Sequence, residues 1–572
     1  MKRIQTRVLS AITVTMVFLI GISTALLLNS DFGKLEVKTA VINNGDKELS
    51  GLLYRSASAD NRVPAIVIAH GISESKDMMS SLGLELSRRG FVVLCLDLLG
   101  HGQSGGTVED GRNESSFGVT AAVQYLRSQP FVNSSAIGLI GHSLGGGAVR
   151  AAAAKDSQIG AVVLIAGGLG DVAQGPEYGT LNSIFPKNLL VVVGKYDVLF
   201  NITELATREL PSAFNTNQTV VPGVLYGAFQ SHTARKLFTP ATTHLFEPFD
   251  STIITEIIAW MQNAFKITQA SETKLNASLI YLEREVAILA AVVGLFGIIF
   301  LAFFPVTRVI GSKPPKDVPL KRIRTLGGWR AYTIWDALNL ALFLPMVFVG
   351  FVISFPPLIF GASLAWWMLA TGLIGLLIAA KNLPKLFSSK IGLKETLEKT
   401  FDRRDWLTAI VLFVILIAVA SLLETIFTLN LRIIAPIFRA IASGRRLGVF
   451  IAFLPFSLAY FGTEGLYLHE FIDRKQHSNW VGLRNCVKTV LIKITPFLAL
   501  ICLQYLPKLF FNIWILPGTI GFLVEFLWLI IPIFIITTTC SWWFYRNTQR
   551  VGTGAIFNAM MIAWVAAVVF PF

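Results

Sequence analysis

Cysteine and charge are both scarce in this sequence. Four cysteines are scattered over 572 residues, and their spacings match neither a disulfide framework nor a metal site. Charged residues make up only 15% of the chain and hydrophobic residues 53%, a balance too apolar for an ordinary soluble protein. The composition therefore excludes a small disulfide-stapled domain, gives no indication of a metal or another cofactor, and indicates a membrane protein.

Long hydrophobic runs are absent between residues 30 and 283 but occur on both sides of this segment. An uncharged run of about 21 residues, from Val8 to Leu28, is longer than the apolar region of a signal peptide, and no cleavage pattern follows it. Beyond residue 284, uncharged stretches of about 18 to 25 residues recur. We therefore predict a transmembrane anchor over 1–29, a globular domain over 30–283 and a membrane domain of about eight helices over 284–572.

The net charge of +14 does not indicate a nucleic-acid partner. Residues 30–283 carry 19 Lys and Arg against 23 Asp and Glu, whereas the remainder of the chain carries 30 against 12. Positive charge beside apolar helices is typical of cytoplasmic loops in contact with membrane lipids. Lys2, Arg3 and Arg7 thus place the start of the chain in the cytoplasm and residues 30–283 on the extracytoplasmic side of a cell membrane. In this topology the inner segments hold 23 Lys and Arg, and the short outer loops hold five.

Some features of the membrane part have more than one interpretation. Four of the five outer basic residues lie in LRIIAPIFRAIASGRR, residues 431–446, which we expect to lie at the membrane surface as an amphipathic segment. Glu424, Glu464 and Glu525 fall within predicted spans, where an acidic side chain either serves function or pairs with a base such as Lys493.

The segment placed outside the cytoplasm contains all of the N-x-Ser/Thr sequons. They begin at Asn113, Asn133, Asn201, Asn217 and Asn276.

Residues 35–283 alternate short β-branched runs with stretches of helical length. Strands are predicted near 35–42, 50–55, 63–70, 91–97, 135–141, 159–167 and 188–194. Helices are predicted near 76–90, 115–128, 143–155 and 250–265. This alternation is typical of a mostly parallel sheet with helices on both faces, so the predicted fold class is α/β, followed by an all-α transmembrane domain.

One glycine-rich turn in this domain contains a candidate nucleophile. The pentapeptide Gly141-His142-Ser143-Leu144-Gly145 follows a predicted buried strand and opens a predicted helix. On such a turn the serine hydroxyl stands above the sheet, and the flanking glycines avoid clashes in the strained bend. A bend with an incidental serine is the alternative, but the strand before it and the helix after it favour a nucleophile at Ser143.

A serine nucleophile needs an acid and then a histidine further along the chain. Asp197 follows the last predicted strand, at the carboxyl end where sites collect in α/β sheets, and Asp171 is its nearest rival. His244 lies just before the last predicted helix, whereas the alternative His232 precedes the segment expected to form a final strand. We therefore predict a catalytic set of Ser143, Asp197 and His244.

Taken together, these motifs resemble those of the α/β-hydrolase superfamily, in the branch that contains serine aminopeptidase-like and dienelactone-hydrolase-like domains. The resemblance covers less than half of the chain and says nothing about the membrane helices. The matching residues are Ala69-His70-Gly71, Asp97 to Ser104, Gly141 to Gly145, Gly194 to Asp197, and His244.

The resemblance implies a mechanism. Ser143 would attack a carbonyl, His244 would take and return the proton, and Asp197 would orient the imidazole. The backbone N–H groups of Leu144 and Ile72 would bind the oxyanion. The remaining family histidines, for which the resemblance implies structural roles, are His70, His101 and His142.

The loops beside the predicted site are short. About 21 residues separate the last two predicted strands, too few for a large helical cap, so we expect a pocket that is open or covered by the face of the bilayer. The 46 residues between Asp197 and His244, which include VVPGVLYGAFQ, could add a small partial cover.

Functions of different classes stay open at this point. The first is a membrane serine hydrolase that cleaves an ester, thioester or amide of a small-molecule or lipid-like acyl substrate. The second is a transport or sensing protein whose hydrolase-like domain binds a ligand, and a third is an acyltransferase with the same triad. Because a binding domain does not need Ser143, Asp197 and His244 together, the complete set favours the enzyme.

Overall fold

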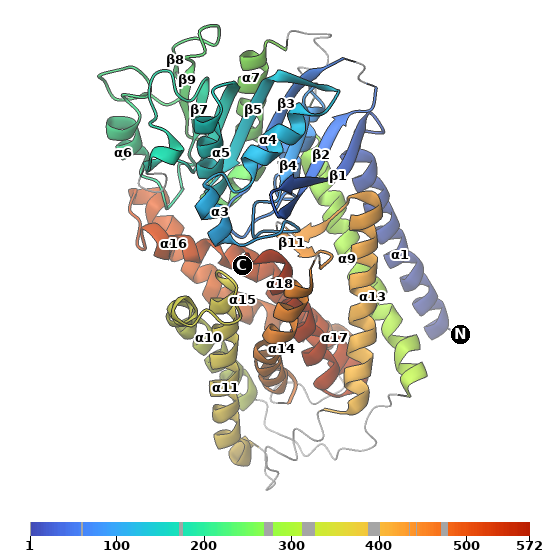
Figure 1. Ribbon diagram of the computed structural model, residues 1–572. Coiled ribbons are helices and arrows are strands. Elements are labelled where there is room, and N and C mark those ends of the chain that lie inside the picture. Colours follow the sequence, from blue (N-terminus) through green and yellow to red (C-terminus); the bar gives the residue numbers. More distant parts are fainter. Residues whose placement is uncertain are drawn as a thin grey trace.

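A computed structural model places a mixed α/β domain against a bundle of long helices (Figure 1). In the view of Figure 1 the sheet lies at the top and the bundle below it, and α16 and the β11 hairpin lie where the two parts meet. The structure describes residues 2–58, 61–170, 175–267, 278–311, 326–386, 401–433, 435–441, 443–470 and 479–572.

Nine strands of the α/β domain form a single sheet in the order β1-β2-β4-β3-β5-β6-β7-β9-β8. The strands are β1 Leu35–Asn44, β2 Lys47–Ser56, β3 Val63–Ala69, β4 Val92–Leu96, β5 Val132–His142, β6 Ile159–Ile165, β7 Leu189–Val192, β8 Leu225–Tyr226 and β9 Arg235–Phe238. Strands β4, β3, β5, β6, β7 and β9 are parallel, whereas β1, β2 and β8 add antiparallel edges. The predicted mostly parallel sheet is confirmed, and the final strand expected after His232 is β9. Within this sheet, only the short edge strand β8 was not predicted.

The sheet is buried because helices cover both of its faces. The helices of this domain are α2 Ser80–Ser87, α3 Val108–Glu114, α4 Val119–Arg127, α5 Leu144–Lys155, α6 Ile202–Glu204 and α7 Ser251–Phe265, with η2 Pro176–Tyr178, η3 Leu205–Glu209 and η4 His244–Phe249. Side chains of β3 alternate between two cores: Val67 packs with α4 and α5, and Ile68 packs with α2 and α7. Continuous apolar strands such as β3 are therefore explained by burial on both sides.

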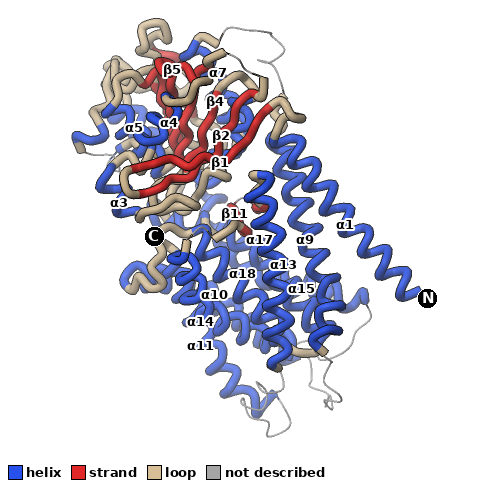
Figure 2. Tube along the Cα trace, turned by 45° about the vertical axis from the view of Figure 1, so that its right-hand side comes forward, coloured by secondary structure: helices blue, strands red, loops and turns tan. Residues whose placement is uncertain are grey.

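The remainder of the chain is built almost entirely from long apolar helices (Figure 2). They are α1 Lys2–Asn29, α9 Tyr281–Ile310, α10 Leu326–Val352, α11 Gly361–Leu386, α13 Arg403–Phe427, α14 Gly444–Gly465, α15 Asn479–Phe511, α16 Gly518–Glu525, α17 Leu527–Thr548 and α18 Gly552–Val569, with η5 Leu466–Glu470. Over the described residues, nine segments are long and apolar enough to cross a membrane, α16 and α17 being counted as one.

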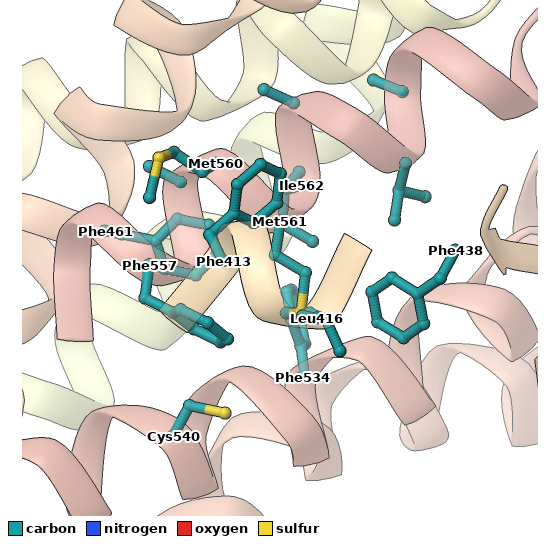
Figure 3. Packing of buried hydrophobic residues seen from close by; sticks show 14 of the residues in the cluster. Phe413, Leu416, Phe438, Phe461, Phe534, Cys540, Phe557, Met560, Met561 and Ile562 are labelled. Carbon is teal, nitrogen blue, oxygen red and sulfur yellow. The ribbon is translucent and has the colours of Figure 1, made fainter. Parts of the chain in front are cut away.

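Aromatic, Leu and Met side chains fill the centre of the helical bundle. Phe413 and Leu416 of α13, Phe534 of α17 and Met561 of α18 belong to one continuous buried cluster (Figure 3). Helix α18 is buried along most of its length and lies beside α13, α14 and α17. A helix that is apolar all round is expected at such a central position.

The basic segment 431–446 is not an amphipathic segment at a lipid surface, so this expectation is wrong. Residues Leu431–Ile433 and Ala435–Phe438 form a hairpin, β10 and β11, and Arg439 follows it. Arg439 is fully buried and pairs with Asp97 (2.9 Å), Asp77 (3.1 Å) and Glu424 (3.1 Å). Arg439 is buried because the buried carboxylates of the α/β domain and of α13 require a positively charged partner.

Two of the three glutamates within predicted spans pair with basic side chains. Glu424 accepts from Arg439, and Glu464 lies 2.5 Å from Lys493 Nζ, so the paired interpretation of these two residues holds. Glu525 contacts the α/β domain instead and is described with the candidate site. Among the sequons, Asn276 lies outside the described residues.

Candidate active site

Ser143 lies on a tight turn between β5 and α5. Its backbone has φ of 51°, a left-handed value that is unusual for a residue other than glycine. The turn is so close-packed that a Cβ on Gly141 would lie 2.1 Å from the carbonyl oxygen of Gly145. A Cβ on Gly167 would lie 1.9 Å from the carbonyl oxygen of Ser143. The glycines are thus required by steric contact, and the strain at Ser143 matches the geometry of a nucleophile elbow.

Asp197 and His244 meet at the carboxyl end of the sheet. Asp197 lies in the loop after β7, and His244 opens η4, just before α7. His244 Nδ1 lies 2.8 Å from Asp197 Oδ2, and both side chains are buried. Burial by itself would lower the pKa of His244, but the Asp197 carboxylate raises it above its usual value. The pair therefore fixes the orientation of the imidazole and stabilises its protonated form.

Ser143 and His244 line the same pocket. His244 Nε2 is buried and has no hydrogen-bond partner among the described residues, so the structure does not join it to the Ser143 hydroxyl. Ile72 also lines this pocket, and Leu144 is the first residue of α5, where backbone N–H groups lack partners within the helix. Leu144 thus follows Ser143 directly at the start of α5, and Ile72 shares the pocket of Ser143.

The rival histidine does not line this pocket. His232 is exposed, and its Nδ1 lies 3.4 Å from the side-chain nitrogen of Asn188. Asp171 lies outside the described residues. The predicted partial cover VVPGVLYGAFQ does not form: this segment contains the edge strand β8, and none of its residues lines the pocket.

Helices of the apolar bundle form the second wall of the pocket. Phe522, Glu525, Phe526 and Leu529, from α16 and the start of α17, line it together with Ser143 and His244. The expectation of a pocket that is open or covered by lipid is therefore wrong, because a helix of the membrane domain covers it.

This cover is anchored by specific contacts. The edge of the Phe522 ring meets the His244 ring at a centroid distance of 5.2 Å. Glu525 Oε2 accepts a hydrogen bond of 3.0 Å from the backbone N–H of Leu245, and Glu525 Oε1 accepts from the Tyr505 hydroxyl. The N–H of Gly518 donates to the carbonyl oxygen of Val198, next to Asp197. Helix α16 therefore contacts the loops that carry both the acid and the histidine.

His70 and His101 hold loops rather than face the pocket. His70 Nε2 accepts from the Leu98 N–H, and its Nδ1 lies 2.7 Å from the Gly71 carbonyl oxygen. His101 packs edge-on against His70, and its Nδ1 lies 3.0 Å from the Leu99 carbonyl oxygen. Burial lowers the pKa of both imidazoles, so both are neutral hydrogen-bonding groups.

His142 lies between two buried glutamates that the sequence motifs did not reveal. Its Nδ1 is 3.0 Å from Glu74, and its Nε2 is 3.4 Å from Glu247 and 3.1 Å from the carbonyl oxygen of His244. Although burial alone would lower it, the two carboxyl groups raise the pKa of His142 to about 10. Burial raises the pKa of Glu247 to about 7, against the opposing effect of His142. The only sequence signal was position, since Glu74 follows His70-Gly71 and Glu247 lies three residues after His244.

These acidic groups tie the loops of the site together. Glu74 accepts from the Gly71 N–H at 2.6 Å, and Glu247 accepts from the Gly194 N–H at 2.6 Å. Donor atoms of His142, His244 and Glu247 lie within 4.8 Å of one another, a distance at which three ligands could hold a metal ion. A histidine must be neutral to ligate, and protonated His142 does not fit that role.

The strand order, the turn at Ser143 and the loops at the carboxyl ends define an α/β-hydrolase domain. In agreement, a family model described as the alpha/beta hydrolase fold matches residues 64–197.

Curated relatives and solved structures resemble the same part of the chain. The chain is 28% identical, over 116 residues or 20% of its length, to a bis(hydroxyethyl) terephthalate hydrolase of Streptomyces coelicolor. It matches an uncharacterized 31.7 kDa protein in the traX-finO intergenic region of Escherichia coli with the same identity over the same number of residues. The chain spans 35% and 40% of the lengths of these two relatives. An esterase of Pyrococcus furiosus matches with 18% identity and a TM-score of 0.32, over 41% of this chain and 94% of that one. An α/β hydrolase of a Penicillium species matches with 16% identity and a TM-score of 0.31, over 41% of this chain and all of that one.

Proposed function

We propose that this protein is a membrane-anchored serine hydrolase that cleaves an ester, thioester or amide bond. One observation carries the proposal: His244, paired with Asp197 at 2.8 Å, shares a buried pocket with Ser143, which lies on a strained strand-to-helix turn. A ligand-binding domain would need neither the strained serine nor the oriented imidazole.

The reaction that we propose has two halves. Ser143 Oγ attacks the substrate carbonyl carbon while His244 Nε2, which has no hydrogen-bond partner among the described residues, accepts the hydroxyl proton. The N–H groups of Leu144 and Ile72 stabilise the negative charge on the carbonyl oxygen. The imidazolium then protonates the leaving alcohol, thiol or amine, and an acyl group stays on Ser143.

Hydrolysis of the acyl-enzyme repeats these steps with water. His244 takes a proton from the water, whose oxygen attacks the acyl carbon, and then returns a proton to Ser143 Oγ as the carboxylic acid leaves. Asp197 orients the imidazole and stabilises the imidazolium in both halves.

An activity-based probe tests the nucleophile. Purified protein in detergent is treated with a fluorescent fluorophosphonate, and we expect the wild type to be labelled and Ser143→Ala to be unlabelled. Ser135→Ala, which changes an exposed serine on β5, serves as the matched control and should label like the wild type. Equal labelling of the wild type and Ser143→Ala, or no labelling of folded wild type, would refute the proposal.

The α/β domain is proposed to face the extracytoplasmic side. This orientation rests on Lys2, Arg3 and Arg7 before α1 and on the basic inner loops. A membrane-impermeant maleimide on intact cells should label Val41→Cys, which is an exposed position on β1, without permeabilisation. It should label Lys381→Cys, near the opposite end of the bundle, only after permeabilisation, and the reverse pattern would refute the orientation.

A further inference from the structure

A second cavity lies beside the candidate active site, among the helices of the bundle. Ser73, Phe526 and Leu529 line both this cavity and the pocket of Ser143. Its other walls come from α10, α11, α16, α17 and α18. The two spaces are therefore neighbours that share one boundary, with the catalytic groups at one end and the membrane domain at the other.

The lining of this intramembrane cavity is apolar. Representative lining residues are Phe343, Leu364, Leu523, Ile533 and Val565. Between Leu523 and Ile533 the cavity follows ten residues along α16 and α17, which corresponds to about 15 Å of helix. An apolar cavity of this length suits an extended hydrocarbon chain better than a compact polar molecule.

The few polar side chains of the cavity wall also favour an apolar ligand. The Ser363 hydroxyl donates to the carbonyl oxygen of Val347 at 2.9 Å, and the Trp367 indole N–H donates to that of Asn339 at 2.8 Å. Because both groups already donate their hydrogen atoms within the protein, neither has a free donor for a polar ligand.

Ser73 is the exception, and it lies at the boundary. Its side chain is buried, its hydroxyl has no hydrogen-bond partner among the described residues, and its backbone has φ of 61°. Because Ser73 follows Ile72, this hydroxyl lies close to the position proposed for the substrate carbonyl. A polar atom of a ligand at the boundary would satisfy it, whereas the cavity beyond would hold only apolar atoms.

We propose that the intramembrane cavity binds the acyl chain of the substrate, so that the enzyme acts on long-chain acyl esters or amides such as those of lipids. This proposal rests on the proposed function, because it assigns the acyl side of the bond that Ser143 would attack. The acyl carbonyl lies at Ser143, Ser73 lies at the boundary between the two spaces, and the hydrocarbon chain passes Phe526 and Leu529 into the bundle.

The test compares two probes that require only an active Ser143. The rate of labelling is measured with an ethyl fluorophosphonate and with a dodecyl fluorophosphonate on the full-length protein in a short-chain detergent. We expect the dodecyl probe to react at least about tenfold faster, the effect of burying about two methylene groups.

A pair of variants on one helix locates the effect. Ile533→Trp fills the cavity, whereas Ile535→Trp places the same bulk on an exposed face of α17. We expect Ile533→Trp to remove the preference for the dodecyl probe while its ethyl rate is kept, and Ile535→Trp to behave like the wild type. The retained ethyl rate shows that a variant is folded.

The outcomes separate the two proposals. Equal rates for both probes, or an unchanged preference in Ile533→Trp, would overturn the acyl-chain cavity while the hydrolase proposal stands, provided that Ser143→Ala is unlabelled. Absence of labelling by both probes would overturn the hydrolase and the cavity together.

Discussion

The two walls of the candidate active site differ in origin and in chemistry. The wall from the α/β domain carries the titratable groups, with Ser143, His244 and Glu74 on loops at the carboxyl ends of parallel strands. The wall from the membrane domain is apolar apart from Glu525. The comparison indicates that the α/β domain would carry the catalytic groups and that the helical domain would select the substrate.

The largest expected effect lies on the α/β wall. In Asp197→Asn the amide cannot stabilise the imidazolium of His244 and favours the wrong tautomer, so kcat should fall by about 10⁴-fold. Steady-state hydrolysis of a p-nitrophenyl ester measures this, with the exposed Asp46→Asn as control. A loss below tenfold would mean that another acid supports His244.

The next effect concerns the junction that holds the two walls together. Arg439→Met leaves the buried carboxylates of Asp97, Asp77 and Glu424 without this partner, which should reduce the free energy of unfolding by about 3–5 kcal/mol. Thermal unfolding in detergent measures the change. The neighbouring Arg445 is exposed, so Arg445→Met is the matched control and should unfold like the wild type.

A smaller effect is expected on the membrane wall. Glu525→Ala removes the acceptor for the Leu245 N–H, next to His244, and should lower kcat about 10- to 100-fold, since a hydrogen bond to a carboxylate contributes about 1.5–3 kcal/mol. Glu525→Gln keeps an acceptor oxygen and should recover most of this loss. If both variants keep full kcat, the membrane wall does not position the histidine loop.

The smallest expected effect is a shift in pH dependence. His244 accepts a proton only when neutral, and Asp197 raises its pKa, so kcat/KM should fall with decreasing pH through a midpoint above 6.5. The Glu247 carboxylate also raises the pKa of His244, so Glu247→Gln should lower the midpoint. A midpoint below 6.5 in the wild type would contradict the assignment of His244 as the base.

The sequence predicted the α/β wall far better than the membrane wall. Local patterns identify Ser143 because a strand, a glycine turn and a helix follow one another within a few residues. Asp197 and His244 could be proposed because parallel strands end at one edge of the sheet. Their pairing at 2.8 Å depends on tertiary structure, which the sequence pattern does not reveal.

The membrane wall could not be predicted because its contacts join residues far apart in sequence. Glu525 lies 280 residues from Leu245, and hydropathy alone marks it only as an acid within a span. Sequence distance also explains why the prediction for Arg439 is wrong. The pattern places this residue at a lipid surface, but it pairs with Asp97, which lies on a loop far away in the sequence. Periodicity identifies helices, but it does not say what they cover.

One experiment tests directly whether both walls hold a single ligand. A fluorophosphonate with a long alkyl chain that ends in a photoreactive diazirine is reacted with the protein, irradiated, and mapped by mass spectrometry of the digest. We expect phosphonylation at Ser143 and cross-links from the end of the chain to the cavity wall, around Leu364, Ile533 or Val565. Cross-links confined to the α/β domain, or to bulk lipid and detergent, would contradict the shared site.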